Sequence, residues 1–506
     1  MRGRHHALFI LLLRPATIAL ALALASCSSK AQPPTETSGN TTPQQGSTPG
    51  TPDAGGGTTP STCGFLSTAA PFALPAITGA PTTPFAAMTG SIACATGTAK
   101  LTYTLADLDA DGALDLVVTS ACDDATIGVT AWLVYPGSAA GFAATATRYT
   151  IPPASPAGCA VVSLFDANGD LLPDYVVTSL CNDATVGSSR WLVYPNVKNG
   201  FASAATSYAL PPGMSPGAFA GTGAATATCA SASGTNDPAF ALFDINGDGK
   251  LDFVVTQACD ADAIGTNAWR VYLGVAAGAS QAPTTFTLPS NPTYTAGAFA
   301  STSGTLSCSA SASKPQFGLL DFDADGKLDL VVTQSCNDPS VGTNVWLLFH
   351  NTGTGFGASA SLALPDMAGL PTDSFPSLGA AGTCAAGVGA PTYAILDADG
   401  DARPDLLVTH DCADALTGVS YWQLFTNTGT GFAPAFRAFT LPSALGATSA
   451  APVGLTGSSQ CATAPTHPAF TTAYLAGLTL DVVVTTGCAD ATVGRTQWLL
   501  YPASCK

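Results

Sequence analysis

Apolar residues in this chain gather in short runs bounded by Gly, Pro and Asp, and little of the sequence repeats with the period of a helix. The runs are rich in Val, Thr and aromatic residues, as in LVVT at 116–119 and WLLF at 346–349. Short β-branched or aromatic runs between turn-forming residues are typical of strands. The pattern therefore predicts an all-β protein.

One unit of this pattern recurs six times. Each copy has an acidic loop of nine residues, a Val-rich run, a cysteine, and a tryptophan 25 positions after the loop begins. The loops begin at Asp107, Asp166, Asp244, Asp321, Asp397 and, in a degenerate copy, Ala473. The tryptophans are Trp132, Trp191, Trp269, Trp346, Trp422 and Trp498, which are all that the chain has. Such repeats bury their apolar faces by stacking on one another, so we expect one large repeat domain with the tryptophans in its core.

Four strands are predicted in each repeat, and in the first they cover residues 101–106, 114–120, 132–135 and 142–151. The fourth strand begins at a Gly-Phe pair and ends at Leu-Pro or Ile-Pro. The sixth repeat stops at Tyr501-Pro502 without this strand, whereas an extra copy, residues 64–75, follows Cys63. We predict that this N-terminal strand completes the last repeat. The result would be a closed six-bladed β-propeller of four-stranded antiparallel blades over residues 63–505.

The cysteines follow the repeat. Twelve of the fifteen form one pair around each acidic loop, which in an exported protein favours disulfides. Zinc ligation is disfavoured because the pairs contain no Cys-x-x-Cys motif and no histidine recurs beside them. The expected pairs are Cys94 with Cys122, Cys159 with Cys181, Cys229 with Cys259, Cys308 with Cys336, Cys384 with Cys412, and Cys461 with Cys488. Cys63 and Cys505 remain, and we predict that they lock the two ends together.

The first 62 residues are predicted to lie outside the repeat domain. Residues 1–27 have a basic start, an apolar stretch and Leu-Ala-Ser-Cys at 24–27, which looks like a bacterial lipobox with Cys27 as the acylated residue. A plain secretory signal is the alternative. Ser28 after the cysteine implies sorting to the outer membrane or cell surface. Residues 28–62 contain no aromatic side chain and almost no aliphatic one, so we expect a flexible tether.

The acidic loops carry the candidate chemistry. They place Asp or Asn at positions 1, 3, 5 and 9, with a glycine at the turn, and such a set of hard oxygen ligands suits Ca²⁺ and disfavours soft metals. Asp at position 9 and flanking strands argue against a helical EF-hand. The candidate ligands are Asp107, Asp109, Asp111, Asp115, Asp166, Asn168, Asp170, Asp174, Asp244, Asn246, Asp248, Asp252, Asp321, Asp323, Asp325, Asp329, Asp397, Asp399, Asp401 and Asp405. We expect about five structural Ca²⁺ ions.

These loops, followed by Val-rich strands and by Asn-x-Gly-x-Gly-Phe at 351–356 and 427–432, resemble the FG-GAP and VCBS repeats, of which the integrin α-subunit propeller is the best-known member. The resemblance implies calcium in the blade loops and ligand recognition on the opposite rim. Leu171 and Ala402 depart from it, since they replace the glycine at position 6, and we expect weaker binding there. The sixth loop keeps only Asp481 and is predicted to bind nothing.

Charge and the remaining polar groups bear on function. The net charge is −17, and 18 of the 33 acidic residues lie in the five loops, which argues against nucleic-acid binding. The acids of a recurring Cys-x-Asp turn, Asp124, Asp183, Asp338, Asp414 and Asp490, are interpreted as Asx turns rather than ligand contacts. His350, His410 and His467 are scattered, so no catalytic role is assigned.

We therefore expect a monomeric, non-enzymatic lipoprotein that acts in adhesion or ligand binding. Its protein or glycan ligand would contact the rim that carries the repeat cysteines, here called the disulfide rim, because long loops on a rigid scaffold usually hold binding residues. The alternatives are a polysaccharide lyase or hydrolase on a propeller scaffold and a purely structural envelope protein.

Overall fold

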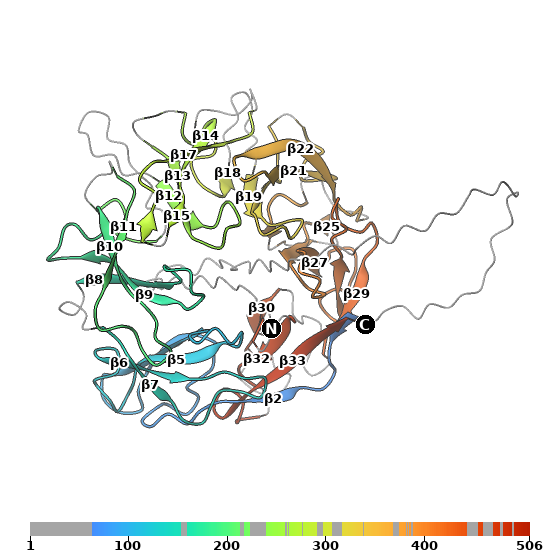
Figure 1. The fold of residues 1–506 in the computed structure, drawn as a ribbon. Coiled ribbons are helices and arrows are strands. Elements are labelled where there is room, and N and C mark those ends of the chain that lie inside the picture. The colour runs from blue at the N-terminus through green and yellow to red at the C-terminus, as the bar shows by residue number, and fades with distance from the viewer. Residues whose placement is uncertain are drawn as a thin grey trace, which may run out of the picture.

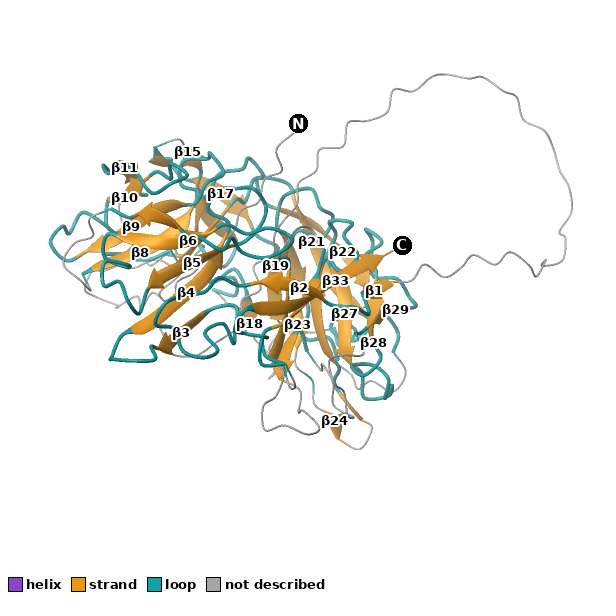
Figure 2. Cartoon of the chain, turned by 90° about the horizontal axis from the view of Figure 1, so that it is seen from below, coloured by secondary structure: helices purple, strands orange, loops and turns teal. Residues whose placement is uncertain are grey.

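The computed structural model describes residues 63–152, 159–212, 217–222, 239–258, 261, 263–275, 277–290, 297–305, 316–336, 338–367, 374–380, 382, 384–385, 388–442, 454–458, 469–475, 479–487 and 490–505. Strands and loops make up these segments, and no helix occurs among them (Figure 2). No helix capable of spanning a membrane is therefore found in this part of the chain. The predicted signal, Cys27 and tether lie outside the described residues.

Each repeat contains four strands that pair antiparallel in chain order, as in the sequence β4–β5–β6–β7 of the first repeat. The first strands are β4 (Lys100–Ala106), β8 (Ala160–Phe165), β12 (Ala239–Phe243), β19 (Gln316–Leu320), β26 (Thr392–Leu396) and β31 (Ala469–Ala473). The second strands are β5 (Asp115–Ser120), β9 (Asp174–Leu180), β13 (Asp252–Gln257), β20 (Asp329–Val332), β27 (Asp405–His410) and β32 (Asp481–Val484). The all-β prediction is confirmed.

The third strand of each repeat carries the tryptophan, and the fourth lies at the outer edge. The third strands are β6 (Ala131–Tyr135), β10 (Arg190–Tyr194), β14 (Ala268–Tyr272), β21 (Val345–Asn351), β28 (Tyr421–Phe425) and β33 (Gln497–Cys505). The fourth strands are β7 (Thr147–Thr150), β11 (Thr206–Ala209), β17 (Thr284–Thr287), β22 (Phe356–Ala363), β29 (Arg437–Thr440) and β2 (Ala70–Ala73). Short additional strands are β1 (Cys63–Phe65), β3 (Gly90–Ala93), β15 (Gly274–Val275), β16 (Gly278–Ala279), β18 (Gly304–Thr305), β23 (Gly379–Ala380), β24 (Cys384–Ala385), β25 (Val388–Gly389) and β30 (Thr456–Ser458).

The N-terminal strand β2 is the fourth strand of the sixth repeat, as the sequence predicts. It pairs antiparallel with β33 in a register that places Phe72 opposite Trp498. The same register places Tyr149 opposite Trp132 in the first repeat. Beside it, β1 pairs with the end of β33, and Cys63 forms a disulfide with Cys505. The first and last described residues therefore lie next to each other (Figure 1).

The Gly-Phe pairs do not lie where the sequence analysis placed them. In the first repeat the fourth strand covers only Thr147–Thr150, and Gly141 instead forms a parallel bridge to Ala73, in the outer strand of the sixth repeat. A Cβ at Gly141 would lie 2.3 Å from the backbone nitrogen of Ala73, which explains the glycine. The predicted strand 142–151 was therefore too long. In the fourth repeat, by contrast, β22 does begin at Phe356.

The same bridge joins every successive pair of repeats. Its members are Ala73 with Gly141, Thr150 with Gly200, Ala209 with Gly278, Thr287 with Gly355, Ala363 with Gly431, and Thr440 with Gly64. The sheets accordingly follow one another around a common centre, with the red C-terminal sheet beside the blue N-terminal strand (Figure 1). The described chain thus forms small antiparallel sheets in a circular order.

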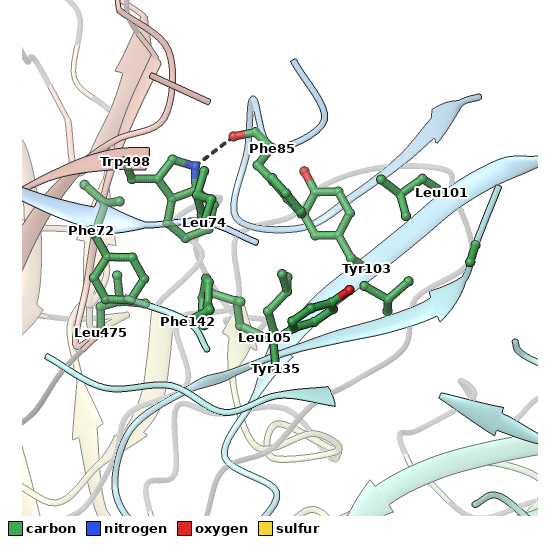
Figure 3. Close-up of a cluster of buried hydrophobic side chains, with 14 of the residues drawn as sticks. Phe72, Leu74, Phe85, Leu101, Tyr103, Leu105, Tyr135, Phe142, Leu475 and Trp498 are labelled. Carbon is green, nitrogen blue, oxygen red and sulfur yellow. Dashed lines mark hydrogen bonds between the residues drawn. The ribbon is translucent and has the colours of Figure 1, made fainter. Parts of the chain in front are cut away.

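The hydrophobic core consists of six clusters, each shared by two successive repeats. Within them a tryptophan contacts the phenylalanine of the next Gly-Phe pair, as in Trp498 with Phe142, whose ring centroids are 5.8 Å apart (Figure 3). Trp346 and Phe432 form the same edge-on contact at 5.9 Å. Among the described residues, Trp191, Trp269, Trp346 and Trp498 each also donate an Nε1 hydrogen bond to a phenylalanine carbonyl. The tryptophans are therefore core residues, as predicted.

Candidate metal sites in the acidic loops

Each complete acidic loop lies between the first and second strands of its repeat, and the position-9 aspartate is the first residue of the second strand. The Asp115 side chain is 2% exposed and accepts two backbone hydrogen bonds: Oδ2 from Leu108 N at 3.0 Å and Oδ1 from Gly137 N at 2.9 Å. The corresponding aspartates of the other four complete loops accept the same two bonds. Position 9 therefore ties the loop to the connection between the third and fourth strands.

The other carboxylates shape the loop from inside. Asp107 Oδ2 accepts a hydrogen bond from Gly112 N at 3.0 Å, and Asp109 Oδ1 accepts one from Asp111 N at 3.2 Å. Asp111 Oδ1 in turn accepts one from Ala113 N at 2.8 Å. These bonds wind the backbone so that alternate side chains converge. The spacing of acids at positions 1, 3 and 5 is therefore also the spacing that this turn requires.

Leu171 and Ala402 do not change the loop. Position 6 has a positive φ in all five loops: 90° at Gly112, 83° at Gly249 and 88° at Gly326, but also 73° at Leu171 and 74° at Ala402. Position 4 has a positive φ in each as well. The two side-chain-bearing residues thus adopt the glycine conformation at a cost of roughly 1–2 kcal/mol. The backbone conformation does not test whether these two loops bind a cation more weakly than the others, so the weaker binding stays a prediction.

Carboxylate oxygens converge in three of the loops. Three of them lie within 4.8 Å of one another in each of the sets Asp107, Asp109, Asp115; Asp321, Asp323, Asp325; and Asp397, Asp399, Asp405. Asp107 Oδ1 and Asp399 Oδ1 are buried and have no hydrogen-bond partner. A buried, unpaired carboxylate oxygen is costly unless a cation or a donor meets it. The donor set and these two atoms therefore fit a hard divalent cation.

Burial makes the position-9 carboxyls unusual acids. It raises the pKa of Asp115, Asp174, Asp252 and Asp329 to about 7, and that of Asp405 to about 8. Neighbouring loop carboxylates raise these pKa values further, whereas the hydrogen bonds from backbone N–H groups lower them. Burial likewise raises the pKa of Asp321, at position 1, to about 6. A cation at the centre of the loop would favour the charged forms. Without one, these loops hold charge at an energetic cost.

The loops are joined to the neighbouring repeat. Asn351 Nδ2 donates to the carbonyl of Ile245 at 2.7 Å, and Asn427 Nδ2 donates to that of Phe322 at 2.9 Å. In both cases the acceptor is position 2 of the preceding repeat's loop. Asn196 makes the same bond to Leu108 at 2.8 Å. The loops of the first, third and fourth repeats are thus each tied to the repeat that follows.

The sequence analysis named Asn351 and Asn427 only as part of the family resemblance, and it did not single out Asn196. It gave no role to the buried phenylalanines that accept the tryptophan hydrogen bonds, namely Phe85, Phe219, Phe299 and Phe375. A signal was available, since three of them follow a tryptophan by 28 to 30 residues. The degenerate sixth loop retains the bond from Leu475 N to Asp481 Oδ2, at 3.3 Å. Its predicted lack of a cation stays a prediction.

The opposite ends of the strands carry the cysteines. Cys94 is bonded to Cys122 and Cys159 to Cys181, as expected, and Cys336 and Cys412 are also disulfide-bonded. The remaining repeat cysteines are outside the described side chains. Most of the long connections of the disulfide rim, which are expected to form the ligand-binding surface, also lie outside the described residues. The acids of the Cys-x-Asp turns form Asx turns as interpreted, for example Asp124 Oδ1 with Thr126 N at 2.8 Å.

No protein-family model matches the chain, and no curated protein matches it. Among solved structures, the Tc holotoxin pore of Photorhabdus luminescens is similar over 79% of this chain, with 15% identity and a TM-score of 0.43; the match spans 14% of the toxin chain. An Agrocybe aegerita lectin described as recognising non-reducing terminal N-acetylglucosamine matches 77% of this chain and 75% of its own, with 13% identity and a TM-score of 0.36. The Dos1 propeller matches 82% of each chain, with 8% identity and a TM-score of 0.28. At such identities the likeness concerns fold alone.

Proposed function

We propose that this chain is a calcium-binding, six-bladed β-propeller of the FG-GAP/VCBS type that serves as a binding module, without catalysis, at a bacterial envelope. The observation that carries the proposal is the recurrence of one loop backbone geometry in five repeats, with three carboxylate oxygens close together in three of them. In two of these loops a buried carboxylate oxygen has no hydrogen-bond partner. A set of hard oxygen donors of this kind fits Ca²⁺.

The six bridges between repeats support a closed ring. Each pairs a glycine, followed by phenylalanine in five of the six cases, with the outer strand of the preceding repeat, and the bridge between Thr440 and Gly64 has the same form as the internal ones. The Cys63–Cys505 disulfide lies at this point. A ring of blades has no long open sheet edge, which suits a protein outside the cell.

Calcium would act on structure. Asn196, Asn351 and Asn427 connect three of the loops to the following repeats, so a cation that orders a loop also orders a junction. At free Ca²⁺ of about 100 times Kd, one site adds about 2.7 kcal/mol to the free energy of unfolding. The acidic rim would then supply rigidity. The disulfide rim, which is stapled at Cys94–Cys122 and Cys159–Cys181, would present the protein or glycan contact surface.

Metal analysis and thermal unfolding of the oxidised protein test the calcium sites. We expect about five Ca²⁺ per chain and a large fall in melting temperature in EDTA. Asp109→Ala should remove one equivalent with little effect on the fold, because it deletes the position-3 ligand, whose Oδ1 accepts a backbone bond from Asp111 N. Asp123→Ala is the matched control, since this exposed acid lies in the same repeat but outside the loop. Absence of bound calcium in the wild type would overturn the proposal.

Export and binding need separate measurements. Mass spectrometry should find acyl chains on Cys27, and Cys27→Ala should release the protein from the membrane fraction. Glycan and envelope-polymer arrays probed with the calcium-loaded protein should show binding without turnover. Turnover of a polysaccharide would instead favour the lyase or hydrolase alternative, and silence on every array would favour a purely structural protein.

A further inference from the structure

One acidic loop is accompanied by a nitrogen donor. Four positions after each tryptophan, directly beside the loop of the same repeat, the chain carries Pro136, Pro195, Leu273, His350, Thr426 and Pro502. Only the fourth repeat places an imidazole there. This histidine is far from the other two in sequence and was given no role in the sequence analysis.

The histidine is directed at two of the loop carboxylates. Its Nδ1 lies 3.3 Å from Asp323 Oδ2 and 3.6 Å from Asp329 Oδ2, and one donor atom from each of the three residues lies within 4.8 Å of the others. The Nδ1 atom itself is buried and has no hydrogen-bond partner, although the whole side chain is 44% exposed. The arrangement therefore offers two oxygens and one nitrogen to a single point that solvent can reach.

The all-oxygen set is weakened in the same loop. Lys327 Nζ lies 2.6 Å from Asp325 Oδ2, so the position-5 carboxylate has an ammonium partner and less negative charge to offer a cation. Asp329 accepts backbone bonds from Phe322 and Asn351, yet each carboxylate oxygen has a second lone pair. The fourth loop thus loses part of one oxygen ligand and gains an imidazole.

We propose that Asp323, Asp329 and His350 Nδ1 bind a divalent first-row transition metal ion in preference to Ca²⁺, while the other four complete loops bind Ca²⁺. The fourth loop then holds the fifth Ca²⁺ only when no transition metal ion is present. The inference rests on the proposed function, because it takes the loops as cation sites. Calcium takes oxygen ligands, whereas an imidazole nitrogen favours a transition metal ion. The carboxylates of Asp323 and Asp329 can bind the same ion beside the imidazole. Water would complete the coordination, since the Asp323 side chain is 36% exposed.

Mn²⁺ is a suitable probe because electron paramagnetic resonance counts it and detects a directly bonded imidazole nitrogen. The purified protein is first saturated with Ca²⁺ and then titrated with Mn²⁺. We expect one tightly held Mn²⁺ per chain with a ¹⁴N coupling. His350→Ala should abolish the coupling and lower the Mn²⁺ affinity of this site by at least about tenfold. Even mutation of residues that only hydrogen-bond to metal ligands typically lowers metal affinity by this factor. His410→Ala is the matched control and should behave as wild type.

The outcomes separate the two proposals. Calcium binding with no ¹⁴N-coupled Mn²⁺, or unchanged Mn²⁺ binding in His350→Ala, overturns this inference and leaves the calcium propeller intact; His350 is then an ion-pair partner of the loop. Mn²⁺ binding with a nitrogen ligand but no calcium at any loop supports the inference and overturns the calcium proposal. Failure of both metals to bind overturns both.

Discussion

The buried position-9 carboxyls predict an unusual pH dependence of stability once metal is removed. Asp405 is the strongest case: its side chain has no exposed surface, and burial raises its pKa from 3.8 to about 8. Four equivalent carboxyls have a pKa of about 7. The perturbation is to strip the protein with EDTA and to vary the pH across this range.

The sign follows from proton binding. A pKa raised in the folded state means that the folded protein holds more protons than the unfolded chain between about pH 4 and about pH 8. Stability is therefore fully present below the unfolded pKa and is lost as the pH rises through the folded pKa. Each carboxyl contributes a slope of up to about 1.4 kcal/mol per pH unit, and a shift from 3.8 to about 7 corresponds to a ceiling of about 4 kcal/mol.

Urea unfolding at several pH values between about 5 and about 8 measures this slope. The EDTA-treated protein should be most stable at the acid end. The calcium-loaded protein should show the opposite trend, because cations bind only the deprotonated ligands. In Asp405→Asn the EDTA slope should become shallower. The variant is destabilised at the acid end by about 1–3 kcal/mol because one backbone donor loses its acceptor, and this deficit should shrink as the pH rises and the wild-type carboxyl ionises.

Asp490→Asn is the control for this variant, since its carboxylate lies in an exposed turn and accepts its bonds from Thr492. It should leave the slope unchanged. Equal stability of the EDTA-treated protein at both ends of the pH range would refute the reasoning. It would mean that these carboxyls ionise freely in the fold, and that cations are not needed to offset their burial.

Three further outcomes test the ring. Phe432→Ala should lower the free energy of unfolding by about 3–5 kcal/mol, because it leaves a cavity beside Trp346. Phe436 is 41% exposed, so Phe436→Ala should lower it by under about 1 kcal/mol in the same urea assay. Similar losses in the two variants would contradict a role of Phe432 in joining the fourth and fifth repeats. Replacing Cys63 and Cys505 by serine should lower the free energy of unfolding by about 2–5 kcal/mol without changing the calcium stoichiometry. An unchanged midpoint of urea unfolding would show that this disulfide does not stabilise the closure between the first and last strands. Ala402→Gly should raise the melting temperature, with a gain of about 1 kcal/mol, because φ is 74° there; a fall would exclude strain at this position.

Much of the within-repeat structure could be predicted because it is encoded locally. Short apolar runs between turn-forming residues, together with the spacing of the acidic loop up to Asp115, indicate the first two strands and the loop between them. Elimination of the twelve repeat cysteines left Cys63 to pair with Cys505. The strand at residues 64–75 could be assigned to the last repeat because its counterpart was missing there. These inferences needed only spacing along the chain.

Contacts between repeats could not be read in this way. Gly141 looks like the start of a strand in its own repeat, but its partner Ala73 belongs to the sixth repeat's sheet, and nothing near Gly141 in sequence reveals this. Leu171 looked disruptive because residue preference favours glycine, yet the loop's own hydrogen bonds impose a left-handed backbone on it. His350 was assigned no role because a single histidine carries no periodic signal, whereas the role proposed for it depends on the side chains that surround it.

The seam also determines how the molecule would bear a load. Strand β1 lies between β29, to which it runs parallel, and β33, to which it runs antiparallel. Cys63, the first residue of β1, forms a disulfide with Cys505, the last residue of β33. A pull on the chain from the N-terminal side of Cys63 therefore enters through a sulfur bridge and acts on the fifth and sixth repeats at once. The force runs along hydrogen-bonded strands and cannot peel a single sheet from its edge. If the chain is held through its N-terminal side, the oxidised seam would keep its shape under traction, and reduction of the Cys63–Cys505 bond would leave the load to the hydrogen bonds of β1.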